Sequence, residues 1–142
     1  MKKTLFLVIF TLVCIGNIQA LHVADEDIPR DPNVVEYMPE FPGGMKELMK
    51  FIQENIRYPK SAAKKGIEGR VICQFTIKKD GSIDHKSIIV MRGLHKSLDK
   101  EAIRIIKKMP KWKPGEDFNG QAIDYKYIIP VEFKLNKETA NP

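Results

Sequence analysis

Residue types that carry acid–base, thiol or metal chemistry are sparse in this sequence. The candidates are His22, His85, His95, Asp84, Asp99 and Cys73. A histidine acts in catalysis only when other groups converge on it, and a metal site needs several ligands at set spacings. The sequence contains no ligand spacing of that kind, no glycine-rich phosphate loop and no nucleophile motif. We therefore expect no enzyme activity, no cofactor and no metal, and an enzyme centred on Cys73 and His85 is the minor alternative.

Cys73 is better explained as a core residue than as a reactive thiol. Apolar residues alternate with more polar ones from Val71 to Ile77, which predicts a strand with Cys73 on its apolar face. The other cysteine, Cys14, lies in an amino-terminal segment that we expect to be removed. No disulfide framework is therefore predicted.

The first 20 residues have the pattern of an export signal. Lys2 and Lys3 precede an apolar run from Leu5 to Gly16, and the small residue Ala20 follows a short polar stretch. This order is typical of a secretory signal peptide, and the run is shorter than the roughly 20 apolar residues of a membrane-spanning helix. We predict cleavage after Ala20 and a soluble exported protein, and the alternative is a short uncleaved anchor. Either interpretation places the rest of the chain outside the cytoplasm.

The 142 residues leave room for one domain, and their net charge of +6 is unevenly distributed. Residues 1–20 carry +2, residues 21–40 carry −5, and residues 42–135 carry +9 from 20 bases and 11 acids. Three prolines and the lack of a sustained period make residues 21–40 an acidic linker. The basic domain lacks a nucleic-acid-reading motif and follows an export signal, so we expect no nucleic acid among its partners.

Hydrophobic periodicity predicts two main helices and three strands after residue 40. Helical spacing covers residues 45–56 and 98–109, with a short helix at 60–65, and strand patterns cover residues 69–79, 83–92 and 123–135. The order of these elements predicts an α+β fold, in which a small three-stranded antiparallel sheet carries two main helices packed on one face.

Local signals refine these elements. Asp80-Gly81 predicts a hairpin turn, and broken alternation in the next strand suggests a bulge near His85 to Ser87. Ser97 is the expected cap of the second main helix. Met45 and Met49 belong to the apolar stripe of the first helix, so we expect them in the core rather than on a ligand surface.

The last strand, from Ile123 to Leu135, is the most regular segment of the chain. Pro130 cannot donate a ladder hydrogen bond, so this strand should lie at an edge of the sheet or contain a bulge. An open edge offers unpaired N–H and C=O groups to an extended peptide of a partner. Lysine, glutamate and proline on the strand could equally serve only to keep other strands away. The residues alone leave both interpretations open.

A series of short motifs runs in order through the domain. It comprises Phe41-Pro42-Gly43-Gly44, Tyr58-Pro59, Gly66-Ile67-Glu68-Gly69-Arg70-Val71, Asp80-Gly81-Ser82-Ile83, Leu98-Asp99, Glu101-Ala102, Met109-Pro110-Lys111-Trp112-Lys113-Pro114, Asn119-Gly120 and Pro130-Val131-Glu132-Phe133-Lys134-Leu135. In this order the series resembles the carboxy-terminal domain of the TonB energy-transducer family over about residues 41–135. Residues 136–142 then form a polar tail.

The resemblance implies a periplasmic domain that binds the TonB-box peptide of outer-membrane receptors by strand addition and contributes to energy-dependent transport. The implied partner-binding residues are Tyr58, Pro59, Tyr125, Lys126, Tyr127, Ile128, Pro130 and Glu132. The expected partners are TonB-dependent receptors, the ExbB–ExbD inner-membrane complex if the amino terminus stays anchored, and a second copy in a homodimer. Members of the family keep an uncleaved anchor and a long proline-rich spacer, whereas the apolar run of this chain is short and is followed by the linker of residues 21–40. The alternative is therefore a soluble periplasmic interaction module without energy transduction.

Overall fold

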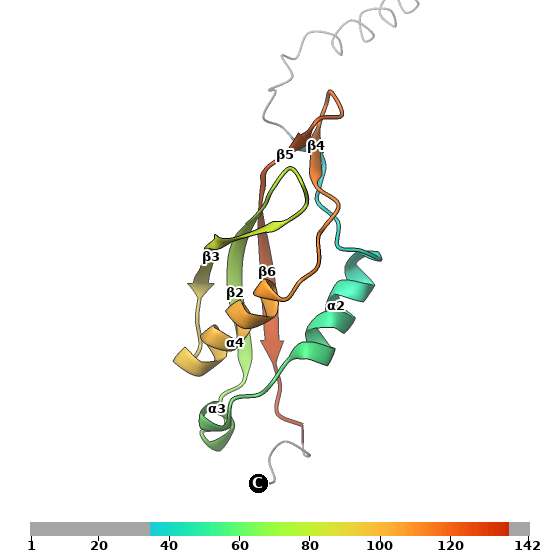
Figure 1. Cartoon of the computed structure of the whole chain (residues 1–142). Coiled ribbons are helices and arrows are strands. Elements are labelled where there is room, and N and C mark those ends of the chain that lie inside the picture. Colours follow the sequence, from blue (N-terminus) through green and yellow to red (C-terminus); the bar gives the residue numbers. More distant parts are fainter. Residues whose placement is uncertain (1–34, 137–142) are drawn as a thin grey trace, which may run out of the picture. The chain divides into compact units, whose positions relative to one another are not determined.

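The structure, a computed structural model, describes residues 35–136 as two antiparallel sheets and three helices (Figure 1). The main sheet has the order β3-β2-β6 and consists of β2 (Gly69–Ile77), β3 (Ile83–Arg92) and β6 (Tyr125–Phe133). The helices are α2 (Gly44–Asn55), α3 (Lys60–Lys64) and α4 (Lys96–Lys107). The predicted α+β class, with three antiparallel strands and two main helices, is confirmed.

One face of the main sheet forms the core because its strands alternate with a period of two. In β2 and β6 the odd-numbered residues point inward, and Val71, Cys73, Phe75, Val131 and Phe133 have no exposed surface. Helix α4 packs on this face with its own apolar stripe, which comprises Leu98, Ala102, Ile105 and Ile106 (Figure 1). The even-numbered side chains of β2 and β6 lie on the opposite face.

The β2–β3 hairpin contains the predicted bulge. The pairing changes register between Gln74, which lies opposite Ile89, and Thr76, which lies opposite Asp84. The extra residues of β3 are held there because the Ser87 hydroxyl accepts a hydrogen bond from the Thr76 N–H at 2.8 Å. The irregular apolar pattern of this strand therefore has a local structural cause.

The cap of α4 differs from the prediction, which named Ser97. His95 is the N-cap: its backbone is extended, and its Nδ1 accepts a hydrogen bond from the Ser97 N–H at 3.3 Å. The prediction was wrong because Ser97 already lies in the first helical turn, where its N–H needs an acceptor. Asp99 instead accepts a hydrogen bond from the Leu94 N–H, which fixes the preceding turn.

A second, smaller sheet was not predicted. It has the order β1-β4-β5 and consists of β1 (Val35–Tyr37), β4 (Gly115–Asp117) and β5 (Ala122–Ile123). Strands of two or three residues are too short to show a period in the sequence. Residues 35–40, which we had placed in the linker, thus contain β1 and the bridge between Glu40 and Lys113.

Several expectations concern residues that the structure does not describe. The predicted signal peptide, the linker up to residue 34 and the tail beyond Asn136 lie outside the described range. Within residues 35–136, no helix is both long and apolar enough to cross a membrane.

Candidate functional site

Strand β6 is an edge strand, as Pro130 predicted. It pairs with β2 without a register shift from Gly69 opposite Phe133 to Ile77 opposite Tyr125. No other strand among residues 35–136 pairs with its second side. One complete row of its main-chain groups therefore faces away from the sheet.

The hydrogen bond of Thr76 shows which residues form that row. Main-chain groups of successive residues point to opposite sides of a strand, and the Thr76 N–H points toward β3. The odd-numbered residues of β2 therefore bond to β6, and Phe75 exchanges its bonds with Tyr127. Even-numbered residues of β6 direct their N–H and C=O groups to the open edge, and the missing N–H of Pro130 falls on that edge rather than in the ladder.

The predicted partner-binding residues of β6 thus fall into two sets. In the outward set, the side chains lie on the face of the sheet opposite the core. This set comprises Lys126, Ile128, Pro130 and Glu132, all of them exposed. Tyr125 and Tyr127 belong to the inward set, and Tyr127 packs its ring against Trp112 at 4.9 Å between centroids. Burial and the neighbouring Tyr125 raise the pKa of Tyr127 above its ordinary value. These two tyrosines face the core side and cannot share a surface with the outward set.

A groove of about 460 Å³ runs beside the open edge, between β6 and α2. Its lining comprises Met49, Ile52, Gln53, Ile56, Tyr58, Pro130, Glu132, Lys134 and Asn136. On the strand side only even-numbered residues line it, as expected if their main-chain groups face the groove. Figure 1 shows α2 beside the carboxyl-terminal half of β6.

The α2 wall of the groove was missed by the sequence analysis. Met45 and Met49 are 62% and 42% exposed, so the expectation that they lie in the core was wrong. Leu48 and Ile52 bury the core side of the helix. The apolar stripe of α2 is wider than the surface that this helix packs against the core. The width of the stripe was the signal in the sequence that could have predicted a second, uncovered apolar surface.

Tyr58 closes one end of the groove, and Pro59 lies just outside the lining. The Tyr58 hydroxyl donates a hydrogen bond to the Ile67 carbonyl, and its ring meets Phe133 edge to face at 5.9 Å. Burial, and then the Glu68 carboxylate, raise the pKa of Tyr58 above its ordinary value. Pro59 is the N-cap of α3, and the φ angle that the proline ring fixes suits that position.

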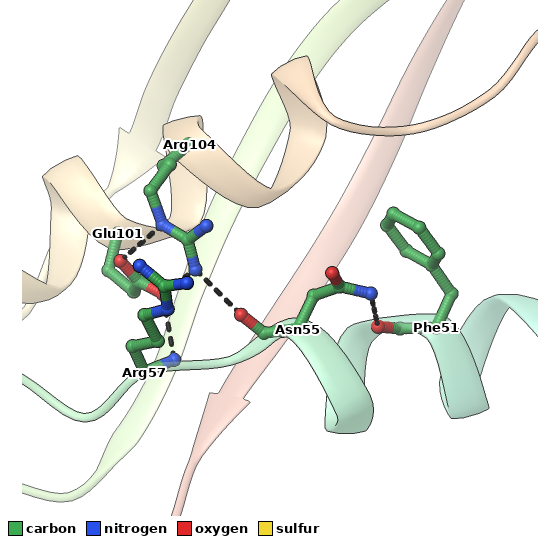
Figure 2. Close-up of polar contacts among 5 residues, drawn as sticks. All are labelled: Phe51, Asn55, Arg57, Glu101 and Arg104. Atoms are coloured by element: carbon green, nitrogen blue, oxygen red, sulfur yellow. Dashed lines mark hydrogen bonds and ion pairs between the residues drawn. The ribbon is translucent and has the colours of Figure 1, made fainter.

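A cluster of hydrogen bonds joins the end of α2 to α4, as Figure 2 shows. Arg104 donates from Nη2 to the Asn55 carbonyl at 2.6 Å and from Nε to Glu101 Oε2 at 2.9 Å. The Arg57 N–H donates to Glu101 Oε1 at 2.8 Å. We call Asn55, Arg57, Glu101 and Arg104 the latch. It satisfies a carbonyl at the end of α2 and fixes the chain that leads to Tyr58.

Glu101 carries the charge of the latch in a buried position. Burial alone would raise the pKa of this carboxyl. The hydrogen bonds from the Arg104 guanidinium and the Arg57 N–H outweigh burial, and the pKa lies below its ordinary value. Sequence analysis missed this role, because partners more than 40 residues apart leave no local pattern.

The residues first considered for chemistry do not form a reactive site. Cys73 is fully buried, and burial raises the pKa of its thiol to about 11. His85 is exposed, and His95 caps α4. Within residues 35–136 no three histidine, cysteine, aspartate or glutamate side chains are placed to hold one metal ion.

Comparisons with known proteins point to one family. The family model described as the Gram-negative bacterial TonB protein C-terminal matches residues 54–135. Two solution structures of the Helicobacter pylori TonB carboxy-terminal domain are similar to this chain. One has 28% identity over 63% of this chain and 91% of that chain with a TM-score of 0.48, and the other has 29% identity over 65% and 82% with a TM-score of 0.44. No curated protein matches the sequence. Because the family model covers more than half of its length, the chain belongs to the family of TonB carboxy-terminal domains.

Proposed function

We propose that this protein binds the TonB-box peptide of outer-membrane receptors by strand addition at the open edge of β6, in the periplasm, and contributes to energy-dependent transport. The observation that carries the proposal is the unpaired row of main-chain groups on β6, which faces a groove of 460 Å³. An edge of this kind gives a peptide main-chain hydrogen bonds, and the pockets beside it give specificity. Membership of the TonB family supports the choice of partner.

The direct test is a titration of the isotope-labelled protein with a TonB-box peptide. We expect the amide signals of Lys126, Ile128 and Glu132 to shift, because their N–H groups face the open edge. Unchanged amide signals along β6 at saturating peptide would contradict the proposal.

A pair of proline variants separates the edge from the ladder. Ile128→Pro removes an N–H that faces the open edge, so it should weaken peptide binding while the fold remains intact. Tyr127→Pro removes an N–H that bonds to β2, so it should lower the free energy of unfolding instead. Circular dichroism and calorimetry on both variants report folding and binding. Undiminished binding by a folded Ile128→Pro protein would exclude β6 as the site.

The role in energy transduction depends on the amino terminus. An uncleaved anchor would connect the domain to the ExbB–ExbD complex, whereas cleavage after Ala20 would leave a soluble periplasmic interaction module. Mass spectrometry of the protein from membrane and soluble fractions discriminates the two. An intact Met1 in the membrane fraction supports transduction, and Leu21 as the first residue supports the soluble module.

A homodimer is the second candidate, and the charges of β6 favour it. If two β6 edges pair antiparallel about Ile129, Lys126 lies opposite Glu132 of the other copy and Ile128 lies opposite Pro130. Sedimentation velocity tests this arrangement. Lys126→Glu should weaken self-association, and adding Glu132→Lys should restore it, whereas a monomer at all concentrations would exclude the dimer.

A further inference from the structure

We propose that α2 forms a second binding wall of the β6 groove, and that the groove takes an acidic extended segment with apolar side chains at alternate positions. This inference rests on the proposed function of the β6 edge. In this inference the residues of α2 determine which peptides bind, because the main-chain groups of β6 alone would accept almost any extended chain.

The alternation follows from the geometry of an added strand. A guest strand on β6 continues the pleat of the sheet, so its side chains point in turn to the helix-covered face and to the open face. Side chains opposite Ile129 and Val131 share the face on which α2 lies, because those two residues are buried on the core side. The guest's side chains on that face therefore meet the groove wall of α2.

That wall is mostly apolar and partly exposed. Met49, Ile52 and Gln53 of α2 and its C-cap Ile56 line the groove. Ile52 is buried, whereas Met49 is exposed, and the exposed Met45 continues the stripe one turn earlier. The flexible thioethers of methionine adapt to guest side chains of different shape. A guest with apolar residues at every second position would cover this surface, and one with polar residues there would leave it wet.

The charge of the guest follows from the rim of the groove. Lys134 lines the groove, and Lys126 is exposed further along the same edge. The Glu132 carboxylate is already engaged by Arg70 at 3.7 Å and Lys134 at 3.3 Å. On α2, the exposed Lys50 lies one turn before the groove residue Gln53 on the same side of the helix. Lys134, Lys126 and Arg70 thus bring three positive charges to this edge against the one carboxylate of Glu132, and the net positive charge complements an acidic segment.

The probe is a nine-residue peptide, acetylated and amidated, in which valine alternates with serine and an acidic residue stands at each end. One control has the same composition with its valines contiguous, and the other has lysine at both ends. The exported protein is labelled at its backbone amides and at its methionine methyl groups. Met45 and Met49 report the α2 wall, and Met91 on β3 is an exposed reference away from the groove.

We expect the alternating acidic peptide to shift the β6 amides and the methyl signals of Met45 and Met49, and to leave Met91 unchanged. The lysine-ended control should bind about tenfold more weakly at low salt, and the difference should narrow in about 0.5 M salt, because surface charges are screened. Met49→Gln replaces an apolar contact by a polar one without changing the charge, so it should weaken binding about tenfold, and the matched variant Met91→Gln should bind as the parent protein does.

The outcomes separate this inference from the function on which it rests. Shifted β6 amides with unmoved methionine methyls, and equal binding of acidic and lysine-ended peptides, would overturn the α2 wall and leave strand addition intact. If neither the amides nor the methyls respond to this peptide or to a TonB-box peptide, both proposals fail. Equal affinity of Met49→Gln and Met91→Gln would also overturn the inference.

Discussion

At the scale of single residues, Gly81 connects the main hairpin to a distant part of the chain. Its φ of 84° requires the left-handed region, and its carbonyl accepts a hydrogen bond from the Trp112 N–H at 2.8 Å. A Cβ atom placed on Gly81 would lie 2.0 Å from the Trp112 carbonyl oxygen. Glycine is therefore required here both by the turn and by the approach of a second backbone.

We predict that Gly81→Ala lowers the free energy of unfolding by about 3 kcal/mol, because backbone strain and a backbone clash add together. Gly66→Ala is the matched control: Gly66 also has a positive φ, of 64°, but nothing lies within 4 Å of its added Cβ. This control should cost about 1 kcal/mol. Urea denaturation of both variants measures the difference. Equal decreases in the free energy of unfolding would show that the close approach of Trp112 adds nothing to the cost of Gly81→Ala.

Cys73 shows how far a single-residue prediction can reach. Its place in an alternating strand predicted a buried thiol, and the structure confirms that it has no exposed surface. The prediction succeeded because a period of two decides which face a strand residue takes. The same reasoning could not reveal the roles of Glu101 and Arg104, which depend on partners from another helix.

At the scale of elements, the latch decides how firmly α2 is held. Arg104 donates to the carbonyl of Asn55, the last residue of α2, and Glu101 accepts from the N–H of Arg57, two residues further on, so they fix the end of the helix that borders the groove. Without these hydrogen bonds, α2 would move more freely relative to α4, and the groove would lose its fixed shape. The latch therefore links the stability of the fold to the shape of the site.

We predict that Glu101→Gln lowers the free energy of unfolding by about 1–2 kcal/mol at pH 7, because hydrogen bonds to a charged group are lost. The pKa of Glu101 is lower in the folded state than its ordinary value near ~4.3. Its stabilisation is therefore complete above that ordinary value and disappears as the pH falls through the folded-state pKa. The gap between parent and variant should close below about pH 4.

Urea denaturation at pH 7, 5 and 3 measures that gap. Glu54→Gln, at an exposed position of α2, is the control and should stay within about 0.5 kcal/mol of the parent at pH 7. A gap between the parent and Glu101→Gln that persists unchanged at pH 3 would contradict the ionised latch.

The elements also show where sequence reasoning ends. Long periodic segments gave helices and strands within about three residues of their observed bounds, and Pro130 correctly placed β6 at an edge. The uncovered flank of α2 could not be predicted, because a helical stripe does not say which neighbour covers which part of it. The small sheet was missed because its strands are too short to show a period and because β1 pairs with β4 about 80 residues away in the chain.

At the scale of the whole molecule, the ordered domain begins earlier than Phe41. β1 pairs with β4, Pro39 is buried, and a Cβ atom on Gly115 would lie 3.2 Å from the Pro39 ring. Glu40 and Lys113 exchange two main-chain hydrogen bonds of 3.0 and 2.8 Å. The segment between the linker and α2 is therefore part of the fold.

We predict that a chain starting at Phe41 unfolds at a lower temperature than one starting at Leu21, by roughly 5–10 °C, because the pairing of β1 with β4, the two bonds between Glu40 and Lys113 and the cover of Gly115 are lost. Thermal denaturation followed by circular dichroism measures this. A chain starting at Pro32 keeps β1 and should match the longer protein. Identical transitions for all three chains would mean that β1 adds nothing to stability.

Under the proposed strand addition, the position of Pro130 also affects how long a partner strand stays bound to β6. Any strand that docks on β6 finds a carbonyl but no N–H at that residue, so its ladder is one hydrogen bond short of complete. A single bond contributes about 0.5–1.5 kcal/mol, which corresponds to a roughly two- to tenfold faster release. Under the proposed strand addition, a partner strand would therefore have a short residence time, and one protein molecule would serve many partner molecules in succession.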